Sequence, residues 1–241
     1  RATAHELALL GADVTVLARS ADALERVVAE LPRRDGQSHA WIEVDVADAA
    51  ALRAKVTGTT AAAPVQILVN NTGGPPGGPA HLADATAYLD AFQRHLIANQ
   101  TLVQCVLPGM REAGYGRVVN VISTSVKEPI RNLGVSNTIR GAVASWAKTL
   151  AAELGPYGIT VNNVLPGYTR TQRLDQILAD RVAATGKASA EIEKAMLATV
   201  PAGRFAEASE IAAAIAFLAS PAAAYINGIN VPVDGGRMQS M

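Results

Sequence analysis

The sequence has very little cysteine and no long hydrophobic segment. Among 241 residues there is one cysteine, Cys105, so no disulfide can form within the chain, and its apolar neighbours predict an inert buried thiol. No apolar run approaches the roughly 20 residues that a membrane-spanning helix needs, and no signal peptide is visible at Arg1. We therefore expect a cytoplasmic protein with no membrane partner.

An excess of either charge is also missing. Lys plus Arg and Asp plus Glu both number 21, so the formal net charge is zero. Zero net charge argues against nucleic acid or an anionic membrane surface as the main partner. The histidines show no zinc-ligand spacing, so we expect no metal. A small molecule is the expected partner.

What the sequence does contain is a regular alternation of strand and helix patterns. Strands are expected at 13–18, 41–46, 65–69, 118–122, 160–165 and 229–233. Helices are expected at 2–10, 21–31, 49–56, 83–114, 136–154, 172–198 and 211–219, with a break near Pro108-Gly109 in the fourth. This order predicts one α/β domain over 1–241, in which helices wrap a parallel sheet.

The stretch 116–154 contains the strongest candidate site. Its strand lacks polar alternation, which is typical of a strand buried on both faces, and it ends in the hydroxyls Ser123 to Ser125. In the following helix, Ser136 and Arg140 are four residues apart and so share one face. We expect a site at the carboxyl end of this strand.

Five segments stand out when they are taken in chain order: Asn70-Asn71-Thr72-Gly73, the strand 117–125, the helix 136–151, the segment 161–167 and Val233-Asp234-Gly235-Gly236. Together they resemble the short-chain dehydrogenase/reductase family, in particular its 3-oxoacyl-carrier-protein reductase-like branch. The resemblance implies a Rossmann-type doubly wound sheet, a dinucleotide at the switch point, and a homotetramer, or else a dimer. It also implies that 171–205 forms a substrate lid.

The family's opening strand and its glycine-rich phosphate loop have no counterpart in this sequence. Residues 1–4 resemble the residues just after that loop. From the usual lengths of a strand and a loop, we expect about 20 residues to precede Arg1.

The family's catalytic positions are also altered. Its tyrosine and lysine fall on Ser136 and Arg140, and its active-site asparagine falls on His95. A serine hydroxyl is far less acidic than a phenol, and an arginine can bind the nicotinamide ribose and supply charge but cannot shuttle a proton. Three interpretations of His95 stay open: a surface helix histidine, a proton donor in place of the tyrosine, or a neutral replacement that preserves the helix geometry.

The cofactor positions are better preserved. The resemblance assigns the cofactor to Asp45 and Val46 at the adenine edge, to Asn71, Thr72 and Gly73 behind the adenine ribose, to Arg140 at the nicotinamide ribose, and to Pro166, Gly167 and Thr171 at the carboxamide. Ala18 stands where an acidic residue would bind the ribose 2′-hydroxyl of NAD, and Arg19 follows, which suits a 2′-phosphate. We therefore expect NADP(H) rather than NAD(H).

The leading hypothesis is an NADP(H)-dependent oxidoreductase that acts on a carbonyl or hydroxyl group through a non-standard proton relay. One alternative is a non-redox enzyme on the same fold; halohydrin dehalogenases keep a serine and an arginine here but also the tyrosine that this chain lacks. Another is a protein that binds a dinucleotide and catalyses nothing. A hydrolytic Ser123–His95 dyad is disfavoured, because the sequence offers no nucleophile elbow and no orienting acid.

Overall fold

The structure is a computed structural model that describes residues 1–240. Its strands are β1 (Thr15–Ala18), β2 (Ala40–Glu43), β3 (Ile67–Asn70), β4 (Gly116–Val121), β5 (Ile159–Pro166) and β6 (Asn230–Val233). Its α-helices are α1 (Ala2–Leu9), α2 (Ala21–Ala29), α3 (Ala49–Ala62), α4 (Ala85–Phe92), α5 (Ala98–Ala113), α6 (Gly134–Leu154), α7 (Gln172–Thr185), α8 (Ser189–Leu197) and α9 (Ala208–Ala219). The predicted alternation of strands and helices is confirmed.

All the strand pairs are parallel, as expected. β1 pairs with β2, and β3, β4, β5 and β6 form a four-stranded sheet in that order. Within residues 1–240 no ladder joins β1 to β3. This break lies where the family resemblance locates the strand that the sequence lacks; the expectation that residues precede Arg1 stays a prediction.

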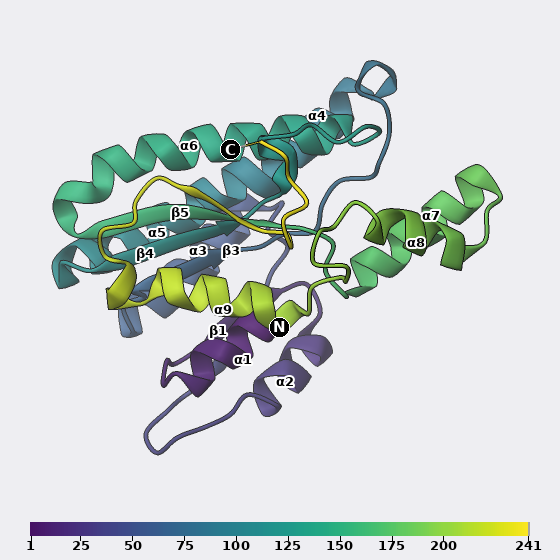
Figure 1. Cartoon of the computed structure of the whole chain (residues 1–241). Coiled ribbons are helices and arrows are strands. Elements are labelled where there is room, and N and C mark those ends of the chain that lie inside the picture. The colour runs from purple at the N-terminus through teal and green to yellow at the C-terminus, as the bar shows by residue number, and fades with distance from the viewer. Residues whose placement is uncertain (241) are drawn as a thin grey trace.

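Helices cover both faces of the four-stranded sheet, which gives the doubly wound architecture (Figure 1). On one face, Val118 of β4 and its partner Val161 of β5 pack against apolar side chains of α5 and α6. On the other face, Val119 and Val164 pack against α9, and α1 lies beside α9. Parallel strands buried on both sides explain why the sequence of β4 shows no alternation.

A chain of carboxamides crosses the four-stranded sheet; those on β3, β4 and β5 are buried and the one on β6 is half-buried. Asn70, Asn120, Asn163 and Asn230 are register partners on β3, β4, β5 and β6. Each of the first three donates its Nδ2 to the Oδ1 of the next, at 2.8, 2.9 and 2.8 Å. The ladder ends at the Oδ1 of Asn70, which is buried without a partner among the described residues.

The expected break at Pro108-Gly109 is wrong, because α5 runs through both residues to Ala113. Pro108 has no N–H to donate to the carbonyl of Gln104, one turn earlier in the helix. Both residues lie on the exposed side of the helix, where water can take the place of the missing donor. The opposite side is anchored in the core by Met110. The helical pattern is interrupted earlier, by a π-helical turn over Gln93–Ile97.

Two segments frame the carboxyl edge of the sheet. The loop at 76–80 is tied to the start of α6 by Gly134 N–H donating to the Gly78 carbonyl at 3.0 Å and by Gly78 N–H donating to the Asn132 carbonyl at 2.7 Å. On the far side of the edge, α7 and α8 project away from the sheet (Figure 1). The first contact fixes the entry of the helix that contains Ser136 and Arg140.

Two glycines of α6 allow this contact to be tested. A Cβ at Gly134 would lie 2.4 Å from the Ala80 Cα, whereas a Cβ at Gly141 would meet nothing within 4 Å. We expect Gly134→Ala to lower the free energy of unfolding by about 1–3 kcal/mol through overpacking. The control Gly141→Ala should raise it by about 0.5–1 kcal/mol through helix propensity. Denaturant unfolding measures both, and equal effects of the two changes would contradict the packing argument.

Candidate active site

The residues singled out in the sequence gather at the carboxyl ends of the parallel strands. Asn71, Thr72 and Gly73 follow β3, Ser123 follows β4, and Pro166 ends β5. Since neighbouring parallel strands end at the same edge, these residues share one edge of the sheet. That edge is the candidate active site.

Ser123 is held in an orientation that leaves its proton free. Its backbone is extended, and its Oγ accepts a hydrogen bond from Ser125 N–H at 3.1 Å. The hydroxyl oxygen is thus partly occupied, while its O–H keeps the capacity to donate. The side chain is half-buried. Such a hydroxyl suits a substrate oxygen that accepts a hydrogen bond.

Arg140 is a buried cation that reaches the end of the same strand, β4. Its Nη1 donates to the Val121 carbonyl at 2.8 Å, and its side chain is 9% exposed. No carboxylate pairs with it among residues 1–240, and its Nε has no partner. Burial, and then the positive charge of Arg173, lower the pKa of Arg140 to about 10, so it stays charged at neutral pH.

His95 lies in the π-helical turn between α4 and α5 and is 3% exposed. The interpretation as a surface histidine is therefore wrong: the wider turn directs the side chain inward. Its Nδ1 lies 2.6 Å from the Thr72 Oγ1, in a hydrogen bond whose direction depends on the imidazole tautomer. This pair joins the loop after β3 to the π-helical turn between α4 and α5.

The imidazole of His95 is neutral at pH 7. Burial, with smaller contributions from the charges of Arg140 and Arg94, lowers the pKa of His95 to about 4, although a backbone hydrogen bond with Gly73 opposes the shift. A neutral imidazole still has one N–H to donate. An imidazolium would be scarce here at neutral pH, so the proton-donor interpretation of His95 needs either a neutral donor or a change in its surroundings.

Ser136 lies in the first turn of α6, one turn before Arg140, and is half-buried. Its hydroxyl makes no hydrogen bond to another group in the described part of the chain, whereas the neighbouring Asn137 bonds the Ile130 backbone at 2.8 Å. The hydroxyl of Ser136 is therefore free for a ligand or for water. It lacks the length and the acidity of a phenol at the same position.

The adenine-side residues lie at the ends of β1 and β2. Arg19 directly follows β1 and is exposed, with no ion pair within the described residues. The Oδ1 of Asp45 accepts from Ala47 N–H at 2.9 Å and lies 3.3 Å from the Arg94 Nη1. Val46 is half-buried beside it. The carboxylate of Asp45 is thus oriented before any ligand arrives.

The structure explains the glycines at positions 73 and 167 of the proposed cofactor site in different ways. A Cβ at Gly73 would meet nothing within 4 Å, so open space faces this backbone. A Cβ at Gly167 would lie 2.6 Å from the Asp234 Cα, and Gly167 N–H donates to the Val233 carbonyl at 2.9 Å. Close packing of the ends of β5 and β6 therefore accounts for Gly167 without a ligand.

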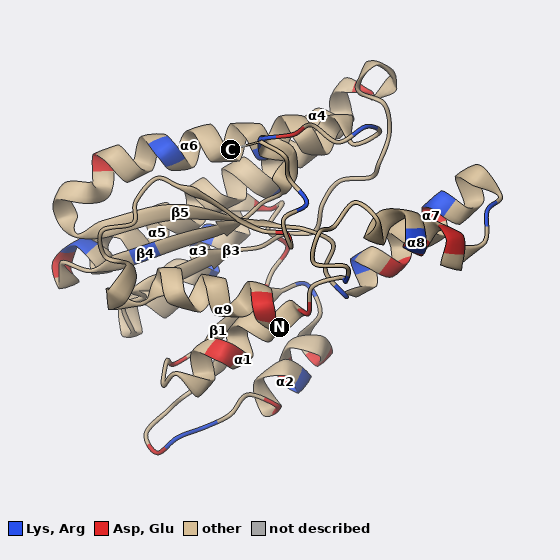
Figure 2. Ribbon diagram, in the orientation of Figure 1, with Lys and Arg blue, Asp and Glu red and all other residues tan. Residues whose placement is uncertain are grey.

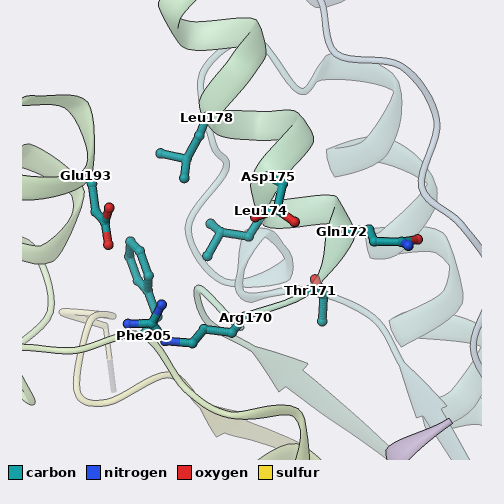
Figure 3. Close-up of a pocket in the computed structure, with 8 residues that line it drawn as sticks. All are labelled: Arg170, Thr171, Gln172, Leu174, Asp175, Leu178, Glu193 and Phe205. Atoms are coloured by element: carbon teal, nitrogen blue, oxygen red, sulfur yellow. The ribbon is translucent and has the colours of Figure 1, made fainter. Parts of the chain in front are cut away.

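A cavity of about 390 Å³ lies between α7, α8 and the segment before them (Figure 3). Leu174, Leu178 and Phe205 give it apolar walls. Its other lining residues are polar or charged: Arg170, Thr171, Gln172, Asp175 and Glu193. Ser123, His95 and Arg140 do not line it. The cavity is thus a neighbour of the strand-end site, joined to it through the chain from Gly167 to Thr171.

The projecting helices α7 and α8 carry charges of both signs, while α6 and α9 have few (Figure 2). None of the helices within residues 1–240 combines the length and the apolar character that crossing a bilayer requires. Three or more His, Cys, Asp or Glu side chains nowhere cluster as a metal site in that range.

Two structural observations fit the binding of a nicotinamide dinucleotide by the residues at the strand ends. The backbone at Gly73 faces open space, and Arg140 keeps a buried N–H without a partner. The adenosine end would be held by Arg19, Asp45 and the residues after β3. The nicotinamide end would lie near Arg140 and the loop after β5.

Comparisons with known proteins agree with this layout. Residues 1–237 match the family described as Enoyl-(Acyl carrier protein) reductase. The chain is 32% identical to the 3-oxoacyl-(acyl-carrier-protein) reductase FabG of Pseudomonas aeruginosa, over 100% of this chain and 93% of that protein. It is 42% identical over 130 residues to the short-chain reductase protein NovJ of Streptomyces niveus, a match that spans 53% of this chain and only 47% of that protein. The solved structure of actinorhodin polyketide ketoreductase with NADPH is similar at a TM-score of 0.92 and 30% identity, over 99% of this chain and 92% of the other.

The neutral state of His95 has a consequence for stability. An unfolded histidine takes up a proton near pH 6.5, whereas the folded one does so only near pH 4. The free energy of unfolding should therefore decrease as the pH falls from about 6.5 to 4, and this decrease should level off below about 4. We expect a side-chain NMR titration of His95 with a midpoint well below 6.5. Wild type should also lose stability relative to His95→Asn over that interval, and a midpoint near 6.5 would contradict the buried, cation-flanked site.

Proposed function

The chain belongs to the short-chain dehydrogenase/reductase family, and on that premise we propose that it is an NADP(H)-dependent oxidoreductase acting on a carbonyl or hydroxyl group of a small molecule. The observation that supports this most directly is that the end of β4 presents the free O–H of Ser123 and, at Val121, holds the guanidinium of the buried Arg140. A bound NADPH would supply a hydride to a carbonyl carbon. The protein's own part is to bind the carbonyl oxygen and to provide its proton.

Cofactor choice is proposed from Arg19. Its guanidinium is exposed at the end of β1, where an acidic residue would favour NAD. Guanidinium groups bind phosphate through charge-assisted hydrogen bonds. The similar actinorhodin ketoreductase, whose structure was solved with NADPH, supports the same choice.

Proton supply is the unusual part of the proposed chemistry. Ser136 cannot replace a phenol, and His95 is neutral at pH 7. The available donors are the hydroxyls of Ser123 and Ser136 and the N–H of a neutral His95. None of these is a strong acid, so reduction of a simple β-keto thioester should be slow. Loss of general acid–base help typically costs ~10²–10⁴-fold.

A second candidate is a dinucleotide-binding protein without turnover. It is favoured by Ser136 and Arg140, which stand where the family resemblance places the acid–base tyrosine and lysine, while the adenine-side residues Arg19 and Asp45 are retained. Cofactor binding and turnover therefore need separate measurements.

We also propose a homotetramer and a substrate-lid role for 171–205. The lid role is supported by the cavity between α7 and α8. Assembly is supported by large apolar side chains that are exposed in two regions. One set comprises Leu82, Leu89, Phe92 and Ile97, and the other comprises Phe217, Tyr225 and Ile229.

Cofactor preference can be tested by fluorescence titration with NADPH and NADH. We expect tighter binding of NADPH. Arg19→Ala should weaken NADPH binding by roughly 10- to 100-fold, the value of a charge-assisted hydrogen bond, and leave NADH binding nearly unchanged. Arg26→Ala on α2 is the control for loss of an exposed cation nearby. Equal or tighter binding of NADH by wild type would overturn the NADP(H) assignment.

The proton relay can be tested by restoring the family residues. Ser136→Tyr combined with Arg140→Lys should raise NADPH-dependent reduction of a β-keto thioester, because Ser123 is already oriented. His95→Asn is the natural third change. Binding of NADPH without turnover by wild type, followed by turnover in the double variant, would favour the second candidate. Brisk turnover by wild type that slows in the double variant would mean that this site has its own effective acid.

A further inference from the structure

The π-helical turn Gln93–Ile97 joins two loops that are distant from it in the sequence. Gln93 and Arg94 bond the loop after β2, 46 and 49 residues earlier, and His95 bonds the loop after β3, 23 residues earlier. In an α-helix, side chains two positions apart diverge by about 200°, because each residue turns the chain by about 100°. A π-helical turn has more residues per turn, so these three consecutive side chains diverge less. One turn therefore reaches both loops.

The contacts with the loop after β2 fix one oxygen of Asp45. Gln93 Nε2 donates to the Ala47 carbonyl at 3.0 Å, and Arg94 Nη1 donates to the Asp45 Oδ1 at 3.3 Å. The same Oδ1 accepts from the Ala47 N–H at 2.9 Å. Within residues 1–240 no hydrogen bond goes to the Oδ2 of Asp45. One carboxylate oxygen is thus held by the chain, and the other is left to accept from an N–H of a ligand.

The loop after β3 depends on a single side chain. In the described part of the chain, residues 72–77 make no backbone–backbone hydrogen bond. The Nδ1 of His95, whose side chain is 3% exposed, lies 2.6 Å from the Thr72 Oγ1, and the imidazole also has a backbone hydrogen bond with Gly73. A Cβ at Gly73 would meet nothing within 4 Å, so the part of the loop that His95 holds faces open space.

We propose that the π-helical turn keeps the adenosine end of the dinucleotide site in shape, with Gln93, Arg94 and His95 as positioning residues. None of the three needs to touch the ligand, because each acts through the loop that it holds. Loops that are ordered before binding lower the entropic cost of binding. The ligand in this inference rests on the proposed function, since Asp45 and Gly73 are given to adenosine by the family resemblance. The links between the turn and the loops do not rest on it.

The positioning role uses His95 in the form that it has at pH 7. Burial first, and then the charges of Arg140 and Arg94, lower the pKa of His95 to about 4. A neutral imidazole has one ring nitrogen that donates and one that accepts, so it can bond Thr72 and the backbone of Gly73 together. An imidazolium would have no acceptor nitrogen. The neutral state is therefore the one that holds the loop with both nitrogens.

The first experiment measures affinity by isothermal titration calorimetry with two probes, NADPH and adenosine 2′,5′-bisphosphate, which has no nicotinamide end. Gln93→Met and Arg94→Met should each weaken binding of the bisphosphate by about 2- to 10-fold, the usual net value of one hydrogen bond. NADPH binding should weaken by the same factor, because the loss lies at the end that the two probes share. Arg94→Lys keeps the positive charge and a donor, so its loss should be smaller than that of Arg94→Met.

Gln104→Met is the matched control. The Oε1 of Gln104, on α5, accepts from the Arg53 Nη2 at 2.6 Å, so this change also removes one amide hydrogen bond, but at neither of the two loops. Its affinity for both probes should equal that of wild type. If wild type binds both probes, and Gln93→Met and Arg94→Met bind them equally well, the inference is overturned and the proposed function stands. If wild type binds neither probe, the proposed function and the adenosine role fall together.

The second experiment needs no ligand and measures NMR order parameters of the backbone amides at 72–74. In Thr72→Val and in His95→Leu these should fall from about 0.85, the value of a rigid backbone, towards about 0.6. The amides of α5 should keep the rigid value, whereas a merely structural role of His95 would loosen the helix instead. His95→Gln, whose amide can donate or accept, should restore part of the order at 72–74.

The same variants connect loop order to binding. Thr72→Val, His95→Leu and the double variant should weaken binding of the bisphosphate by one common factor, because two changes in a single contact are not additive. Thr72→Val alters only a half-buried side chain, so it keeps the test valid if His95→Leu fails to fold. Unchanged order parameters at 72–74 in Thr72→Val would overturn the inference. So would reduced order at 72–74 in a variant whose affinity for the bisphosphate equals that of wild type.

Discussion

The four carboxamides that cross β3 to β6 constrain everything built on the strand ends. Asn70, Asn120, Asn163 and Asn230 pass one hydrogen bond along each strand pair. A shift of register by one residue would bury these amides beside apolar side chains, and each unmade bond costs about 1–3 kcal/mol. Ser123 and Pro166 each follow their asparagine by three residues, and Thr72 follows Asn70 by two. By fixing the strand register, the ladder therefore fixes where these site residues lie relative to one another along the strand direction.

Most of this framework could be predicted from the sequence, because its signals are local. Unbroken β-branched runs identified the buried strands, and the spacing of Ser136 and Arg140 on one helix face needed only helical periodicity. Boundaries were less accurate: the helix expected to begin near Ser136 begins at Gly134, and the one expected to end at Val56 continues to Ala62. Helix ends depend on tertiary contacts, such as that of Gly134 with the loop at 76–80, which local patterns do not contain.

The residues that local patterns could not place are those whose surroundings come from distant segments. Pro108 predicted a break, but α5 is held by its buried face, so the loss of one hydrogen bond on the solvent side is tolerated. For His95 the sequence left open a surface position, a proton donor at the site and a neutral replacement that preserves the helix. Its inward direction comes from a π-helical turn, which adds a residue and shifts the phase of the helix. The contact between His95 and Thr72 joins residues 23 apart in the sequence, and no spacing rule relates them.

Proton supply at this site is a matter of electrostatics as much as of residue type. Burial and the cations Arg140 and Arg94 keep His95, which the family resemblance aligns with an active-site asparagine, without its second proton. A ligand that brings negative charge to this edge raises the affinity of His95 for a proton, and a positively charged nicotinamide lowers it. The protonation state of His95 thus depends on the charge of whatever occupies the site. In a chain without the family's tyrosine, the charge of a bound ligand therefore bears on proton supply as much as the residue types do.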